Sequence, residues 1–206
     1  KKNYSTFKDE FPLLIKIIDA AADLSIQVHP DDKLAKQWHD GSGKTEMWYV
    51  IDTHDENASL ISGFSRVTSE DEFKSHYESG HLMQLMNSIK IAPGDVYYIP
   101  AGKVHSIGKG ALIAEIQQPS DLTYRIYDFD RTDQNGNSRE LHHELAYKAM
   151  NFADCDTGLQ NAHLNNSVLN GNVIRNTRTE LVANEYFVTN KISIEQEYIA
   201  NYERFD

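Results

Sequence analysis

Between residues 89 and 127 the chain breaks into short apolar runs separated by Pro and Gly, and this pattern constrains the fold more than any other. Short runs rich in β-branched and aromatic residues, with turn residues between them, are typical of β-strands. The expected strands span residues 89–91, 96–99, 104–107, 112–117 and 123–127. So many short strands close together in the sequence indicate a sandwich or a barrel.

The flanking sequence adds further strands and a few helices. More strands are expected at 11–18, 24–29, 47–51 and 58–64, a helix at 141–150, and strand-like runs from Val173 onward. A short helix is expected after Asp31, because an Asp at this position can cap it. Ser69 and Glu72 have the spacing of a capping box, which predicts an amphipathic helical insert near 69–88. The chain is therefore expected to be mainly β.

Charge and cysteine content argue against several classes of partner and indicate the cellular compartment of the protein. The formal net charge is −11, which argues against nucleic acid or an anionic membrane as partner, since both select basic surfaces. Cys155 is the single cysteine, so neither a disulfide framework nor a thiolate metal cluster is expected. The apolar run 11–18 is short and interrupted by Lys16, so it reads as a buried strand and not as a membrane span. We expect a cytoplasmic protein, and no feature favours a particular oligomeric state.

The stretch Gly41-Ser-Gly-Lys-Thr45 looks like the end of a phosphate-binding P-loop, but its context differs. The motif needs an earlier glycine at the position of Trp38, because only glycine lets the backbone curl around the phosphates. It also needs a helix beginning at the Lys-Thr pair. Here an aromatic and β-branched run, 47–51, follows and favours a strand. The stretch is better interpreted as a polar turn that leads into a strand.

Three places hold polar residues that core packing does not require: Gln27-x-His29, Glu46 and His105. Taken singly, each has an ordinary interpretation. A histidine on a strand is more often a hydrogen-bonded, half-buried residue than a metal ligand, and a glutamate at the start of a strand is usually solvated. The segment 94–105 changes this, because its spacing G-x5-P-x-G-x2-H resembles the second motif of the cupin superfamily.

In that superfamily the final histidine points into a β-barrel as a metal ligand. The first cupin motif usually offers His-x-His and a later Glu, and here Gln27, His29 and Glu46 fill those places. Two imidazoles, a carboxylate and an amide oxygen suit zinc with a position open to substrate. The same set contains a two-histidine, one-carboxylate triad, which suits non-haem iron. The spacing alone leaves the metal open.

The resemblance is closer than the superfamily. Five segments, 24–32, 43–49, 98–105, 112–118 and 123–131, are similar in sequence and order to type I mannose-6-phosphate isomerases in their short bacterial form. The resemblance implies one Zn²⁺ per chain and interconversion of mannose 6-phosphate and fructose 6-phosphate through an enediol. It implies Gln27, His29, Glu46 and His105 as metal ligands, Arg125 and Lys44 as catalytic residues, and Lys16, Ser25 and Arg131 as substrate-binding residues. Lys103 departs from the expected small polar residue, and we expect it at the pocket rim or in solvent.

The resemblance also implies a fold and a domain organisation. We expect residues 1–150 to form a metal-binding cupin domain, a jelly-roll β-barrel with the helical insert near 69–88. Residues 151–206 are expected to be a linker and the start of a second cupin-like β domain, which the chain does not complete. Two rival functions use the same barrel. An iron-dependent cupin oxygenase would need an apolar pocket, and a non-catalytic sugar-binding cupin would not need the metal.

Overall fold

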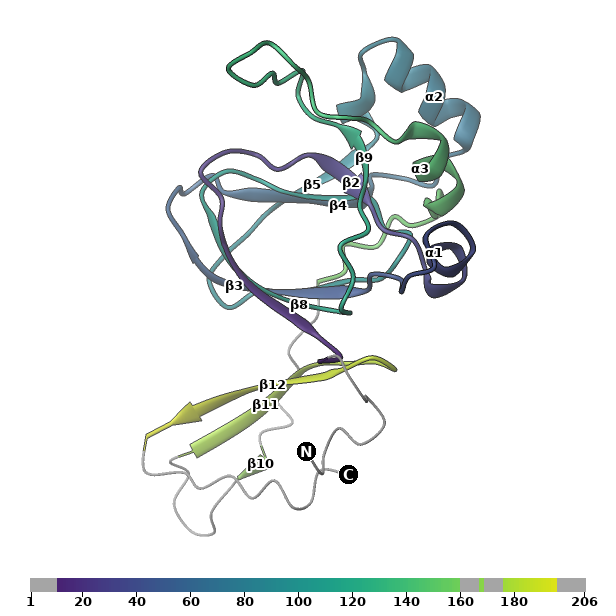
Figure 1. Cartoon of the computed structure of the whole chain (residues 1–206). Coiled ribbons are helices and arrows are strands. Elements are labelled where there is room, and N and C mark those ends of the chain that lie inside the picture. The colour runs from purple at the N-terminus through teal and green to yellow at the C-terminus, as the bar shows by residue number, and fades with distance from the viewer. Residues whose placement is uncertain (1–10, 160–166, 169–175, 196–206) are drawn as a thin grey trace. The chain divides into compact units, whose positions relative to one another are not determined.

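The computed structural model describes residues 11–159, 167–168 and 176–195 (Figure 1). The chain divides into two compact units. One unit is Leu13–Leu159, and the other comprises Lys1–Pro12 and Gln160–Asp206. Each is described by itself below.

Two antiparallel sheets face each other in the first unit (Figure 1). The four-stranded sheet has the order β1-β8-β3-β6, with β1 Leu14–Asp19, β8 Ala111–Gln117, β3 Glu46–Thr53 and β6 Val96–Ile99. The five-stranded sheet has the order β5-β4-β7-β2-β9, with β5 Met86–Lys90, β4 Ser59–Phe64, β7 His105–Ile107, β2 Ile26–Val28 and β9 Tyr124–Tyr127. The mainly β, cupin-type jelly roll expected from the sequence is confirmed. It is a pair of facing sheets and not a closed barrel, because the described strands form two separate ladders.

The helices pack on the outer face of the five-stranded sheet. They are α1 Asp32–His39, α2 Glu70–Glu78, the 3-10 turn η1 Leu82–Gln84 and α3 His143–Ala149. Both predicted caps form, since the Asp31 side chain accepts from Leu34 N–H at 2.8 Å and the Ser69 hydroxyl from Glu72 N–H at 3.2 Å. Helix α2 and η1 account for most of the predicted insert near 69–88, whose last residues begin β5.

Alternation along the strands separates an outer apolar core from a partly polar interior. In β2, Ile26 and Val28 are buried in the cluster that includes Phe73 of α2 and Ala146 of α3, so Gln27 faces the other way, between the sheets. A second apolar cluster fills the interior and includes Trp48, Val50, Ile107 and Ile113. Residues two apart on a strand point to the same face. Trp48 therefore shares a face with Glu46, Ile107 with His105, and Ile113 with Glu115, so these three polar residues lie in the adjoining part of the interior.

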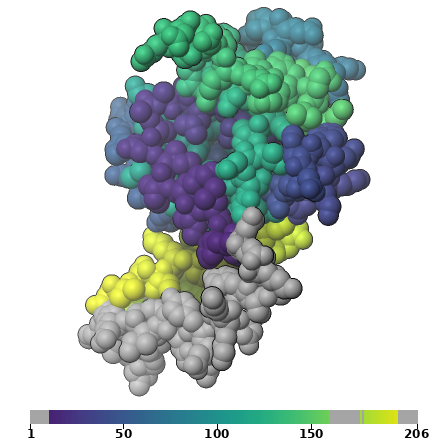
Figure 2. Space-filling model, in the orientation of Figure 1, coloured from purple at the N-terminus to yellow at the C-terminus, as the bar shows by residue number. Residues whose placement is uncertain are grey.

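Segments far apart in sequence meet at α1 in the space-filling view, where the dark blue helix abuts the green chain that follows β8 (Figure 2). His39 Nε2 lies 2.9 Å from the Tyr124 hydroxyl, and Gln118 donates to Asp32. These contacts hold α1, which precedes β3, against the segment that connects β8 to β9.

The second unit contains a small antiparallel sheet of order β10-β11-β12, with β10 Ser167–Val168, β11 Asn176–Ala183 and β12 Val188–Ile194. The Asn184 side chain accepts from Tyr186 N–H and Phe187 N–H at 2.8 and 2.9 Å and so shapes the turn between β11 and β12. Part of the strand-like sequence from Val173 onward lies outside the described residues. In the described part of the chain, every helix is too short or too polar to cross a membrane.

Candidate metal and substrate site

One row of side chains crosses four strands of the five-stranded sheet. Ser62 of β4 lies opposite His105 of β7, His105 opposite Gln27 of β2, and Gln27 opposite Arg125 of β9. Residues directly opposite each other in antiparallel strands have their side chains on the same face. Strand pairing therefore brings His105, Gln27 and Arg125, which the sequence placed on three separate segments, to one inner face.

The facing sheet contributes the acidic residues. Glu46 is the first residue of β3 and lies opposite Gln117 of β8, while Glu115, two residues before Gln117, lies opposite both Lys16 and Trp48. The Lys-Thr pair before β3 begins no helix, which agrees with the rejection of the P-loop interpretation.

His29, Glu46 and His105 are buried and bring their ligand atoms within 4.8 Å of one another. The His29 and His105 Nε2 atoms are 3.1 Å apart. Glu46 Oε2 lies 3.4 Å from His29 Nε2, and Glu46 Oε1 lies 3.6 Å from His105 Nε2. Ligand atoms of a tetrahedral zinc site with bonds of about 2.0–2.1 Å are separated by about 3.3 Å. The triad therefore has the dimensions of a metal site.

Backbone carbonyls fix which nitrogen of each imidazole faces this point. His29 Nδ1 donates to the Leu122 carbonyl at 2.9 Å, and His105 Nδ1 donates to the Lys103 carbonyl at 2.8 Å. A neutral imidazole that is protonated at Nδ1 presents a lone pair at Nε2. Burial lowers the pKa of His29, and burial together with the proximity of the titratable His29 ring lowers the pKa of His105 to about 3. Both rings are thus neutral near pH 7, with converging lone pairs that suit a shared cation.

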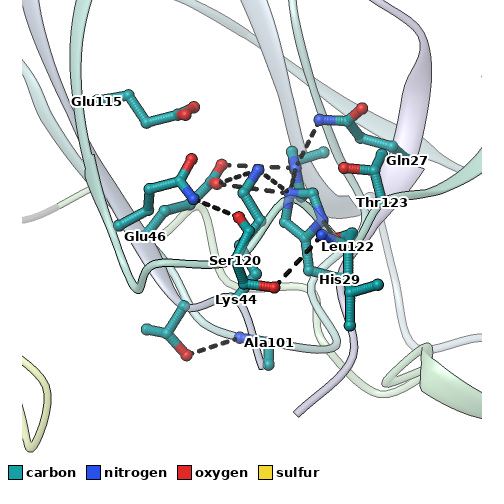
Figure 3. Close-up of polar contacts among 12 residues, drawn as sticks. Gln27, His29, Lys44, Glu46, Ala101, Glu115, Ser120, Leu122 and Thr123 are labelled. Atoms are coloured by element: carbon teal, nitrogen blue, oxygen red, sulfur yellow. Dashed lines mark hydrogen bonds and ion pairs between the residues drawn. The ribbon is translucent and has the colours of Figure 1, made fainter. Parts of the chain in front are cut away.

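Glu46 is completely buried, and neither carboxylate oxygen has a hydrogen-bond partner among the described residues. Burial would raise the pKa of Glu46, but its neighbours His29 and Lys44 hold the pKa below its ordinary value. A buried carboxylate needs a counter-charge. Lys44 supplies one, since its Nζ is 3.0 Å from Glu46 Oε2 and 3.0 Å from His29 Nε2 (Figure 3). The residues present fit a metal ion, because two neutral imidazoles and a fully buried carboxylate meet at one point.

Gln27 completes the set expected from the sequence. Its Nε2 atom lies 3.3 Å from His105 Nε2, and its Oε1 lies 3.5 Å from the Ser25 hydroxyl. A half-turn of the terminal amide would exchange its oxygen and nitrogen and place the oxygen beside His105 Nε2. Gln27 can therefore offer an oxygen to the same point.

Comparisons with known proteins agree with this geometry. The family model described as "Phosphomannose isomerase type I, catalytic domain" matches residues 1–70. The chain is 50% identical over 147 residues to the Bacillus subtilis protein named "Probable mannose-6-phosphate isomerase GmuF", covering 71% of this chain and 46% of that protein. It is 48% identical over 134 residues to a mannose-6-phosphate isomerase of Streptococcus mutans, covering 65% and 42% of the two. The chain is a relative of the type I phosphomannose isomerases.

A crystal structure of the mannose 6-phosphate isomerase from Bacillus subtilis matches with a TM-score of 0.79 and 42% identity, covering 91% of this chain and 57% of that one. A putative mannosephosphate isomerase from Archaeoglobus fulgidus matches with a TM-score of 0.60 at 21% identity, covering 84% and 51%, which supports the fold alone. The chain spans about half the length of the curated phosphomannose isomerases that it matches.

Glu115 lies on the same face of the four-stranded sheet as Glu46, and sequence reasoning assigned it no role. Its carboxylate lies 3.1 Å from Lys16 Nζ and accepts from Trp48 Nε1 at 3.1 Å, and Lys16 also donates to Gln117 at 2.6 Å. Burial and the charge of Glu46 raise the pKa of Glu115, and its side chain points to the same side as Glu46 (Figure 3). The signal available in the sequence was an acidic residue on the buried face of an apolar strand.

Of the two predicted arginines, Arg125 lies on the inner face of the five-stranded sheet, and Arg131 lies in the chain after the end of β9. Arg125 donates to the Glu140 carbonyl at 2.8 Å, and its buried Nε has no hydrogen-bond partner among the described residues. Burial, together with the nearby Arg139, lowers the pKa of Arg125. Arg131 binds Asp128 and the Asp23 carbonyl, each at 2.5 Å, and Arg139 binds the same Asp128. The structure thus joins Gln27, His29, Lys44, Glu46 and His105 by direct contacts, and it places Arg131 in a separate group of contacts.

Proposed function

We propose that this chain carries the site of a metal-dependent aldose–ketose isomerase that interconverts mannose 6-phosphate and fructose 6-phosphate through an enediol. The observation that carries the proposal is the convergence of two neutral imidazoles and a buried carboxylate beside Lys44. Relatives named mannose-6-phosphate isomerase support the choice of substrate.

The proposed metal is one Zn²⁺ per chain, held by His29, Glu46 and His105 with Gln27 as the fourth ligand. Two nitrogen and two oxygen donors in a buried site suit zinc. When bound, the ion would polarise the sugar oxygens and stabilise negative charge on the enediolate. The Leu122 and Lys103 carbonyls keep the two imidazoles in the ligating tautomer.

Isomerisation moves a proton between C2 and C1 of the sugar while a proton also moves between the two oxygens. We assign the carbon proton transfer to Glu115, whose raised pKa brings it closer to the pH at which a carboxyl group can both accept and donate. Lys16 and Trp48 hold its carboxylate in place. Lys44, which donates into the same space, is proposed to hydrogen-bond the sugar oxygen on which charge develops.

Cationic side chains are proposed to bind the phosphate and to offset the acidity of the chain. Arg125 lies next to Gln27 on the inner face, and the fork of a guanidinium matches the oxygens of a phosphate. Ser25, Lys16 and Arg131 are proposed to complete the substrate contacts. The Ser25 hydroxyl contacts the Gln27 amide, so a phosphosugar bound at Ser25 would lie next to a proposed metal ligand.

We also propose a division of labour along the chain. The metal-binding domain is assigned to the unit Leu13–Leu159, which contains every proposed site residue. The boundary expected at residue 150 then moves to the end of that unit, and the small sheet β10-β11-β12 belongs to a second β domain. A cytoplasmic location remains part of this proposal.

A coupled assay that converts mannose 6-phosphate, with and without a chelator, tests the proposed function. We expect activity that is lost with the chelator and restored by Zn²⁺, and that persists without oxygen. Activity that requires oxygen and Fe²⁺ would indicate the cupin oxygenase. Sugar binding without turnover in the metal-loaded protein would indicate the non-catalytic cupin.

A further inference from the structure

Lys103 lies in the interior of the protein, which corrects the expectation that it is at a pocket rim or in solvent. Its side chain is 2% exposed, and its Nζ is 2.7 Å from Asp154 Oδ1 and 2.8 Å from the Asp156 carbonyl oxygen. A lysine is rarely buried this deeply unless it is paired. The ion pair joins the turn before β7 to the segment that follows α3.

That segment, residues 151–159, is called the strap here because it is hydrogen-bonded to both sheets. Its backbone bonds are Phe64 N to Asp154 O at 2.8 Å, Thr68 N to Phe152 O at 3.0 Å, Tyr98 N to Gly158 O at 2.8 Å and Asn151 N to Gly102 O at 2.9 Å. Its own side chains stiffen it, since Asp154 Oδ1 also accepts from Asp156 N at 3.2 Å. The strap is therefore a fixed support for the turn that it touches.

The supported turn, residues 101–103, contacts both proposed histidine ligands. Gly102 N–H donates to the His29 carbonyl at 2.9 Å, and the Lys103 carbonyl accepts from His105 Nδ1 at 2.8 Å. The first bond fixes the backbone of one ligand, and the second fixes the ring orientation and tautomer of the other. Partners of this kind, one step out from the metal, tune its affinity.

We propose that the buried Lys103–Asp154 pair is a positioning device that locks the turn 101–103 and thereby sets the orientation of His29 and His105. Lys103 acts through its own carbonyl and through its neighbour Gly102, and neither its ammonium nor Asp154 touches the metal point in the described contacts. The inference rests on the proposed metal site. It adds a role for two residues that the family resemblance does not assign.

The proposal predicts that replacing Lys103 weakens metal binding, whereas simple electrostatics predicts that it strengthens metal binding. Removing a positive charge near a cation site should strengthen cation binding, because a repulsion is lost. If the pair positions the turn, removing it should weaken binding, because the Lys103 carbonyl and Gly102 N–H are no longer held. Substitutions of such outer partners typically weaken metal binding about 10-fold to 100-fold.

The test compares Zn²⁺ and Co²⁺ affinity by competition with a chromophoric chelator, and the visible spectrum of the Co²⁺ form, which reports ligand geometry. The variants are Lys103→Met, Asp154→Asn and the double variant Lys103→Met/Asp154→Leu, all in the whole chain. Lys74→Met is the matched control, since it removes a lysine from the exposed ion pair with Glu70 on α2. Leu82→Ala, in the outer apolar cluster, controls for loss of stability alone.

We expect Lys103→Met to bind both metals about 10-fold more weakly and to alter the Co²⁺ spectrum, with both controls like the unaltered chain. The double variant should regain thermal stability, because it leaves no unpaired buried charge, without regaining metal affinity. If Lys103→Met does not fold, the double variant Lys103→Met/Asp154→Leu decides, because it leaves the net charge unchanged and should still bind both metals more weakly. Unchanged or tighter binding, or an equal loss in Leu82→Ala, would overturn the inference while leaving the metal site intact. Failure of the unaltered chain to bind either metal would overturn both.

Discussion

At the scale of single residues, the site depends on the protonation states that burial imposes. Two imidazoles are held neutral with Nε2 facing inward, and a fully buried carboxylate has no hydrogen-bond partner among the described residues. Lys44 then becomes the positive partner of Glu46 within the described residues of the site. Changing any of these charges should therefore affect both metal binding and folding.

Glu46→Gln keeps the shape of the side chain and removes its charge. We expect zinc affinity to fall by at least about 100-fold, since a ligand matters more than the outer partners whose loss costs about 10-fold to 100-fold. The metal-free protein should also lose about 3–5 kcal/mol of unfolding free energy, because Lys44 is left as an unpaired buried charge. Metal titration and urea unfolding measure the two effects, with the exposed Glu70→Gln as control. Full retention of zinc in Glu46→Gln would remove Glu46 from the ligand set.

The lowered histidine pKa values predict how stability depends on pH. The unfolded chain protonates His29 and His105 near pH 6.5, whereas the fold holds both pKa values lower, that of His105 at about 3. The unfolded state therefore binds more protons below pH 6.5, and the stability of the metal-free protein falls as pH falls. From pH 7 to pH 5 we expect a loss of about 2 kcal/mol from His105, and a further loss in the same direction from His29.

Urea unfolding of the metal-free protein at the two pH values checks this prediction. His105→Asn should flatten the pH dependence of the unfolding free energy, because it removes a group whose pKa the fold lowers. Equal stability of the unaltered chain at pH 7 and pH 5 would mean that the imidazoles bind protons as readily in the fold as in the unfolded chain.

At the scale of elements, the entry of β3 depends on close packing against α1. Gly43 precedes the strand that carries Glu46, and a Cβ added there would lie 2.5 Å from Asp32 N and 2.6 Å from Asp31 C. Such contacts force backbone movement. The glycine that first suggested a phosphate loop is thus required by helix packing.

Gly43→Ala should cost about 1–3 kcal/mol of unfolding free energy and should weaken metal binding by displacing Glu46. Gly41→Ala is a matched control, because its Cβ would make only ordinary contact, at 3.5 Å from Leu122. Thermal unfolding and zinc titration of both variants check the prediction. Equal behaviour of the two variants would show that the backbone adapts at Gly43.

The sequence anticipated the elements better than the contacts between them. Strands and caps follow from local spacing, the resemblance to a known family indicated Gln27, His29, Glu46 and His105, and the structure brings these four residues together. Sequence reasoning assigned no role to Glu115 and did not indicate that Lys103 is buried. Both residues are surrounded by partners that are distant in the sequence. Lys16 and Trp48 enclose Glu115, and the strap encloses Lys103. Local sequence does not encode such partners.

At the scale of the whole molecule, the sequence indicated a jelly roll but not how its two sheets close. The edge strands are β1 and β6 in the four-stranded sheet, and β5 and β9 in the five-stranded sheet. Whether edge strands pair depends on the twist of the sheets, and the hydrophobic periodicity of the sequence does not give this twist. The carbonyl groups of the strap accept backbone hydrogen bonds from both sheets. Its sequence contains no strand pattern that would have predicted this.

Zinc should stabilise one unit of the chain selectively. An ion that binds only the folded state adds about 4 kcal/mol at 1,000 times its dissociation constant, and all proposed ligands lie in Leu13–Leu159. Hydrogen exchange should therefore slow in β3 and β7 on adding zinc, with no change in β11 and β12. A chelator should reverse the effect, and Glu46→Gln should abolish it. Equal slowing in both units would contradict the assignment of the site to one of them.

The position of Trp48 has a practical consequence. Its indole donates to Glu115, and its ring meets the His105 ring edge-on at a centroid distance of 5.4 Å. An emitting side chain thus touches both the proposed proton-transfer group and a proposed metal ligand. Trp38 is the other tryptophan of the chain, so in a Trp38→Phe variant the fluorescence of Trp48 should report cobalt quenching and Glu115 titration without any attached label.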